Sequence, residues 1–142
     1  MRTVRGPDGR TYLLIKQSSD SSRVRDPETG DEQYFPNDEL DAISGESPLE
    51  TAAHGIDAPV RTILTAVPNE RALGLLVELV DRGEVPILDL LDSYDLCESD
   101  LHGLLVEFKL AGLIEEVELY GERGYAATAV AKEGIERLRA GE

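Results

Sequence analysis

The stretch that decides the fold is residues 69–125, which read NERALGLLVELVDRGEVPILDLLDSYDLCESDLHGLLVEFKLAGLIEEVELYGERGY. Its beginning predicts a helix that starts after Asn69, whose side chain can cap a helix, and that ends at Gly83. Pro86 suits the first turn of a second helix. Apolar residues recur at helical spacing, in the first helix as Ala72, Leu73, Leu75, Leu76, Leu79 and Val80, and in the second as Ile87, Leu90, Leu91 and Tyr94.

A third helix is expected after the short turn formed by residues 96–99. It spans about Ser99 to Ala111, and Gly112 ends it. Its inward positions, spaced by three and four residues, are Leu101, Leu104, Leu105 and Phe108. Because residues 96–99 alone link the second and third helices, the turn between them is short, which is typical of a helix-turn-helix.

A hairpin and a last helix are expected after the third helix. Residues 114–120 predict one strand, residues 121–124 a turn with glycine at both ends, and Tyr125 the start of the return strand. Thr128 can cap a final helix that runs to about Arg139.

Three helices with short links, followed by a hairpin flanked by glycines, resemble the winged helix-turn-helix family of transcription regulators. The resemblance covers about residues 57–140, and its most typical part is Ala111-Gly112-Leu113-Ile114. The chain departs from the commonest family form at Ala131, where a glycine usually follows the capping threonine by three residues; here Gly134 comes later. The resemblance implies an α+β fold that binds double-stranded DNA through the third helix and the wing.

The sequence before this domain predicts a small antiparallel β-sheet. Residues 1–36 contain two hairpins around Pro-Asp-Gly and Pro-Glu-Thr-Gly turns. Residues 37–56 read as an acidic connection in which Ser47 can cap a short helix, and residues 57–142 form the winged helix-turn-helix domain, with a further helix over 59–67. The sheet has few large apolar residues, so we expect it to dock on the helical part.

The charge is strongly acidic. The 142 residues include 14 basic and 29 acidic ones, for a net charge of −15, and lysine occurs only at Lys16, Lys109 and Lys132. This composition resembles small winged helix-turn-helix proteins of salt-loving archaea, because molar salt shortens the Debye length to about 3 Å and screens self-repulsion. The alternative is an acidic protein that binds a basic partner.

Cysteine usage and hydropathy favour a cytoplasmic protein. The single cysteine, Cys97, excludes an internal disulfide, and its place in a turn predicts a small buried hydrophobe. No run of 18 apolar residues and no signal-like start occur in the sequence, so no membrane partner is expected.

The outward side of the third helix supplies candidate DNA contacts. We expect Lys109 nearer to the core side of that helix and Arg123 at the tip of the wing. The candidates are Ser99, His102, Gly103, Val106, Lys109 and Arg123. No arginine, asparagine or glutamine faces outward from this helix to form a bidentate contact with a base.

The predicted N-terminal sheet supplies a second set of cations. Residues 1–25 contain six basic and two acidic residues, whereas the remainder contains eight basic and 27 acidic ones. The candidates for a basic face that meets DNA are Arg5, Arg10, Arg23 and Arg25. The alternative is that these arginines pair with acidic residues of the same chain.

Val106 and Leu110 also allow a different use of the third helix. Two outward aliphatic residues beside Gly103 suit a protein–protein contact, unless the sheet or the last helix covers them. The favoured function is therefore a DNA-binding or DNA-associated regulator, and the alternative is a protein adaptor with the same fold. A homodimer through the 59–67 or the 129–139 helix is a further hypothesis.

Catalytic and metal-binding motifs are absent from the sequence. It contains no HExxH, no CxxC, no Walker loop and no GxSxG. We therefore expect no enzyme activity, no cofactor and no metal.

Overall fold

The computed structural model describes residues 1–141 and divides the chain into two compact units, Met1–Asp57 and Ala58–Glu142. Each unit has its own cluster of buried apolar residues. The first unit includes residues 37–56, which the sequence suggests as a connection. The expected docking of the sheet on the helical part stays a prediction.

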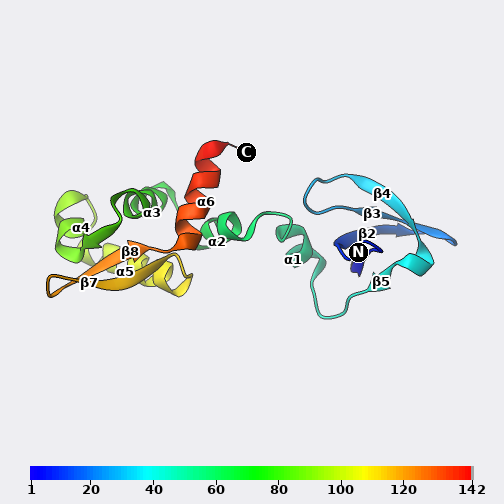
Figure 1. The fold of residues 1–142 in the computed structure, drawn as a ribbon, viewed down its shortest axis with the longest axis horizontal. Helices are drawn as coiled ribbons and strands as arrows, with labels where there is room; N and C mark the ends of the chain where they lie inside the picture. Colours follow the sequence, from blue (N-terminus) through cyan, green and yellow to red (C-terminus); the bar gives the residue numbers. More distant parts are fainter. Residues whose placement is uncertain (142) are drawn as a thin grey trace. The chain divides into compact units, whose positions relative to one another are not determined.

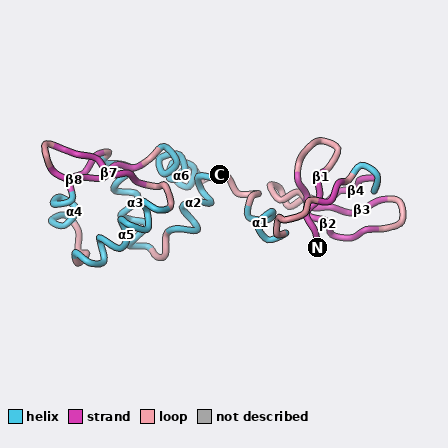
Figure 2. Tube along the Cα trace, turned by 90° about the horizontal axis from the view of Figure 1, so that it is seen from below, coloured by secondary structure: helices cyan, strands magenta, loops and turns pink. Residues whose placement is uncertain are grey.

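The second unit combines five helices with a three-stranded sheet among its described residues (Figures 1 and 2). The helices are α2 (Ala58–Ala66), α3 (Glu70–Arg82), α4 (Ile87–Ser93), α5 (Glu98–Leu110) and α6 (Ala129–Ala140). The strands are β6 (Glu84–Pro86), β7 (Ile114–Leu119) and β8 (Glu122–Ala127). They pair antiparallel in the order β6-β8-β7. The predicted order of helices and hairpin is confirmed.

Capping residues set the ends of α3 and α6. The Asn69 side chain accepts a hydrogen bond from the Ala72 backbone N–H at 3.0 Å, and Gly83 ends α3 with a φ of 81°. Thr128 caps α6 in the same way, and its hydroxyl donates to the Gly112 carbonyl at 2.7 Å. These predicted boundaries are confirmed because the caps satisfy N–H groups that lack a partner within the helix.

The strand β6 is an element that the sequence does not predict. Its three residues are too few to show an alternating pattern. Val85 pairs with Tyr125 of β8, and Pro86 is the last residue of β6 and lies just before α4. The prediction that Pro86 opens the helix is therefore wrong by one residue. Such a short segment becomes a strand only because a neighbouring strand takes up its backbone hydrogen bonds.

The core of the second unit gathers the inward sides of the helices. Its fully buried large side chains are Ile63, Leu76, Leu79, Val85, Leu90, Leu101, Leu105, Phe108 and Leu113. Leu73, which the sequence counts among the apolar positions of its helix, is exposed instead, and so is Leu64 of α2. In α3 the buried positions are 72, 75, 76 and 79, so Leu73 lies beyond the edge of an apolar stripe that is about 100° wide.

Helices α2 and α6 pack closely at Gly134. A Cβ atom on Gly134 would lie 2.4 Å from Ile63 Cδ1 and 2.8 Å from the Pro59 carbonyl oxygen, and both residues belong to α2. Figure 1 shows the two helices side by side at this end of the second unit. Glycine is required here because a side chain would occupy the space of α2.

The first unit is a five-stranded antiparallel sheet with a short helix on it. Its strands are β1 (Arg2–Arg5), β2 (Thr11–Gln17), β3 (Ser21–Arg25), β4 (Glu32–Pro36) and β5 (Asp41–Ala42). Their order is β4-β3-β2-β1-β5. A 3₁₀ helix, η1 (Asn37–Glu39), follows β4, and α1 (Pro48–Ala53) follows β5. The two predicted hairpins are confirmed.

Residues of the expected connection complete this sheet. Strand β5 pairs with β1, and α1 begins after Ser47, whose side chain accepts a hydrogen bond from the Leu49 N–H as predicted. Thr3 in β1 and Thr51 in α1 are both buried, and their hydroxyl oxygens are 2.7 Å apart. This hydrogen bond holds α1 on the sheet.

The core of the first unit is small. Its buried members are Val4, Tyr12, Leu14 and Val24, with Phe35 and Leu40 packed against them. The rings of Tyr12 and Phe35 meet edge to face at 5.3 Å. Tyr34 of β4 is exposed and lies outside this core.

Replacing Gly134 with alanine is expected to destabilise the second unit by about 1–3 kcal/mol, because the added methyl group forces α2 and α6 apart. The matched control is Gly74→Ala in α3, where a Cβ atom meets nothing within 4 Å. That substitution is expected to stabilise the protein by about 0.5–1 kcal/mol through helix propensity. Urea unfolding of both variants measures the difference, and equal effects would contradict the close packing at Gly134.

Candidate nucleic-acid interface

Helix α5 has one buried and one exposed side. Leu101, Leu105 and Phe108 are fully buried, and Leu104 is partly buried, as predicted. The opposite side carries the exposed candidates Ser99, His102, Gly103 and Val106. The periodicity of the sequence therefore predicts the orientation of this helix correctly.

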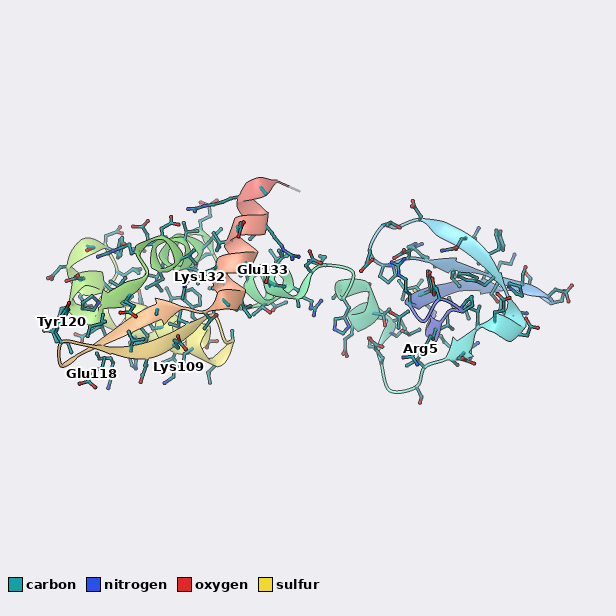
Figure 3. The ribbon with its side chains drawn as sticks, viewed as in Figure 1. Arg5, Lys109, Glu118, Tyr120, Lys132 and Glu133 are labelled. Carbon is teal, nitrogen blue, oxygen red and sulfur yellow. The ribbon has the colours of Figure 1, made fainter. Side chains whose placement is uncertain are left out.

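The loop of the wing is shorter than the sequence suggests. Leu119 of β7 pairs with Glu122 of β8, so the loop consists only of Tyr120 and Gly121, with φ angles of 52° and 82°. Two-residue hairpin loops of this kind need a positive φ at both positions. The predicted turn over 121–124 is therefore wrong. Tyr120 is fully exposed at the tip (Figure 3).

Arg123 lies within β8 and not at the tip of the wing. It is directly opposite Glu118 of β7. Gly124, whose presence favours a turn in the sequence, is buried in the strand, and a Cβ atom there would lie 2.8 Å from the Val85 carbonyl oxygen. This glycine allows β6 to approach β8, and that role is visible only in the folded chain.

An ion pair places α5 beside the wing. Lys109 Nζ lies 3.2 Å from Glu116 Oε1 of β7, and Lys109 is exposed, although the sequence places it nearer to the core. The exposed residues of α5 and of the β7–β8 hairpin together form what we call the α5–wing surface. Figure 3 shows Lys109 and, further along the wing, Glu118 and Tyr120.

The α5–wing surface carries more acidic than basic groups. Its cations are Lys109, which Glu116 neutralises, and Arg123. Neither His102 nor Arg123 makes a side-chain hydrogen bond or ion pair within residues 1–141, so both are available to a ligand. The exposed carboxylates that have no ion pair in the described part of the chain include Glu98, Asp100, Glu107 and Glu118.

Arg10, a predicted DNA contact of the first unit, is held by carboxylates. Its Nη2 lies 2.9 Å from Asp26 Oδ2 and 2.7 Å from Glu28 Oε2, and the charge of Asp26 is the main cause of a raised Arg10 pKa. Nearby, the Tyr12 hydroxyl donates to Asp8 at 2.5 Å. That hydrogen bond lowers the pKa of Asp8 and raises the pKa of Tyr12.

The neighbouring strand β3 shows the same local pairing. Arg23 Nε and Arg25 Nη2 both contact the Glu32 carboxylate, at 3.4 Å and 3.3 Å. Arg5 is exposed, pairs in register with Asp41 of β5, and forms no side-chain hydrogen bond or ion pair within residues 1–141. Of the four predicted cations of the sheet, Arg5 is therefore the one without a carboxylate partner in the described chain.

Cys97 is exposed, so the prediction of a small buried hydrophobe is wrong. The residue precedes the first turn of α5, where its backbone is extended and its side chain reaches solvent. Its Sγ lies 3.4 Å from Ser99 Oγ.

Residues 1–141 contain no group of three or more histidine, cysteine, aspartate or glutamate side chains arranged to hold a metal ion. They also contain no helix that is both long and apolar enough to cross a membrane.

The three-helix core of α3, α4 and α5, followed by the β7–β8 hairpin, defines a winged helix-turn-helix domain. Residues 1–139 match the model of DUF7346, a family of unknown function, and the chain belongs to this family. A comparison with curated proteins finds no match.

Two solved structures are similar to this chain. HlyU from Vibrio cholerae N16961 is 27% identical, with a TM-score of 0.49 over 58% of this chain and 90% of that chain. The transcriptional regulator HlyU from Vibrio vulnificus CMCP6 is 23% identical, with a TM-score of 0.51 over 66% of this chain and 97% of that chain. The second similarity supports the winged-helix fold.

Cys97 is expected to react fully with a thiol reagent in the folded protein, because its side chain is exposed. Absorbance with dithiobis(nitrobenzoic acid) should show one thiol per chain at the same rate with and without urea. Cys97→Ser is the control and should show no reaction. A thiol that reacts only after unfolding would contradict the exposed position.

Proposed function

We propose that this protein is a DNA-binding transcription regulator that acts in the cytoplasm of a halophilic archaeon. In this proposal α5 and the wing dock on duplex DNA, as in other helix-turn-helix proteins. The main support is that Ser99 and His102 are exposed on α5, and Arg123 is exposed on the wing, of a winged-helix fold. The proposal includes a homodimer through α2 or α6, on which Leu64 and Leu138 are exposed.

The fold of a known regulator supports the same proposal. HlyU from Vibrio vulnificus is described as a transcriptional regulator, and 97% of its chain aligns with this one. The alignment covers 66% of this chain. We infer that the first unit contributes separately to DNA binding, for example through a contact from Arg5.

High salt screens the repulsion between an acidic protein surface and the phosphates of DNA. For about five phosphate contacts, affinity falls by about six decades between about 0.15 M and about 3 M salt. A regulator that works in molar salt therefore gains little from basic residues and depends on shape, apolar contact and hydrogen bonds. Ser99 and His102 can donate hydrogen bonds, and Val106 can contact a thymine methyl group.

A second candidate function is a protein adaptor that uses the same fold. It is favoured by the exposure of Val106 and Leu110, at 41% and 80% of their surface. The last helix therefore does not bury them, although the sequence left this open.

The deciding experiment is crosslinking and purification of the tagged protein from its own cells at native salt, with bound DNA and bound protein both identified. Enrichment of discrete genomic sites would establish the regulator. Recovery of one protein without enriched DNA would overturn it and favour the adaptor.

The double substitution His102→Ala/Arg123→Ala is expected to weaken binding to a recovered duplex by about tenfold or more, because it removes two donors of the α5–wing surface that have no side-chain partner within residues 1–141. Fluorescence anisotropy measures the affinity. Lys132→Ala is the matched control, since Lys132 is an exposed cation on α6. Unchanged affinity in the double variant would exclude docking through α5 and the wing.

Lowering KCl from about 3 M to about 0.1 M is expected to lower the melting temperature. At 0.1 M the Debye length is about 10 Å, so the repulsion within a chain of net charge −15 is no longer screened. Circular dichroism measures the transition, and returning the protein to molar KCl should restore it. A melting temperature that is independent of salt would contradict the halophilic origin.

A further inference from the structure

An apolar row runs along the exposed side of α5. Gly103, Val106 and Leu110 follow one another at spacings of three and four residues, so they share one side of the helix. A Cβ atom on Gly103 would meet nothing within 4 Å, which leaves space for another molecule to approach the helix backbone. A contact with DNA through Ser99, His102 and Val106 does not explain the exposure of Leu110.

A hollow continues the row at the N-terminal end of α5. Its volume is about 340 Å³, and Leu96, Gly103 and Leu104 line it together with polar residues, which are Asn69, Arg71, Ser99 and Asp100. The side chains of Leu96 and Leu104 and the backbone of Gly103 allow this hollow to accept an apolar side chain.

Carboxylates border the row and the hollow. Asp100 and Glu107 lie on the same helix, and Glu118 projects from the neighbouring wing. All three are exposed and have no ion pair in the described part of the chain. The single lysine of this helix, Lys109, is already paired with Glu116. The border therefore attracts positive charge and repels phosphate.

We propose that the Gly103–Val106–Leu110 row is a docking surface for a basic amphipathic helix of another protein. Apolar side chains of that helix lie along the row and in the hollow, and its lysine or arginine side chains meet the surrounding carboxylates. This inference names the partner chemistry of the adaptor function and does not depend on DNA binding. Because Ser99 and His102 lie on the same side of α5, a docked helix also blocks a duplex from this surface.

The test uses a synthetic Lys/Leu peptide of about 15 residues with its leucines on one helical side. Two control peptides are a scrambled sequence of the same composition and a Glu/Leu peptide of the same pattern. Isotope-labelled full-length protein is titrated in about 1 M KCl, where a Debye length of about 3 Å suppresses non-specific attraction. Amide chemical shifts report both the affinity and the location of binding.

The patterned basic peptide is expected to shift residues of α5 and β7 and to bind about tenfold or more tightly than either control peptide. Val106→Asp and Leu110→Asp are each expected to weaken binding about tenfold. Leu49→Asp on α1 is the matched control, since Leu49 is an aliphatic residue of another helix that is 82% exposed, and it should leave binding unchanged. Leu110 is 80% exposed, so its variant keeps the test valid if Val106→Asp disturbs the fold.

Three results would overturn the proposal. They are equal binding of the scrambled peptide, unchanged binding by the Leu110 variant, and shifts confined to α2 or α6. Duplex binding by the same variants is measured separately. A variant that loses peptide binding but still binds duplex DNA shows that the two surfaces act independently. If the unchanged protein binds no duplex, the proposed regulator fails, but the peptide result still tests the docking surface.

Discussion

Burial of the inner side of α5 is the interaction on which the rest of the second unit depends. Leu101, Leu105 and Phe108 lose nearly all contact with water, and burying such side chains contributes about 1.5–3 kcal/mol each. Once these residues point inward, the opposite side of the helix must face outward. The position of every candidate contact on α5 is therefore a consequence of core packing.

The acidic surplus is partly balanced within short distances. Glu32 forms ion pairs with both Arg23 and Arg25. Asp26 forms an ion pair with Arg10, and Glu116 forms one with Lys109. Such exposed pairs contribute little to stability individually. They also pair cations that the sequence alone would leave available to a ligand.

The α5–wing surface consequently differs from a typical surface for DNA. On this surface His102 and Arg123, which have no side-chain partner within residues 1–141, lie among exposed carboxylates and aliphatic side chains. Molar salt weakens both the repulsion from phosphate and the attraction that basic residues would provide. Shape and apolar contact then carry more of any recognition, whether the partner is a duplex or a protein helix.

The sequence by itself determined the helices, both N-terminal hairpins and the inward side of α5, because apolar spacing and capping residues such as Asn69 act locally. It also identified Val106 as an outward residue. Only the tertiary structure decided that residues 84–86 form a strand, that Gly124 lies inside a sheet, that Tyr120 forms the tip of the wing, and that Arg10 is paired. The strand, the place of Gly124 and the pairing of Arg10 each depend on a neighbour distant in the chain, and local pattern contains no information about which backbone or charge will lie there. Tyr120 depends on the register of β7 against β8, which the whole sheet sets.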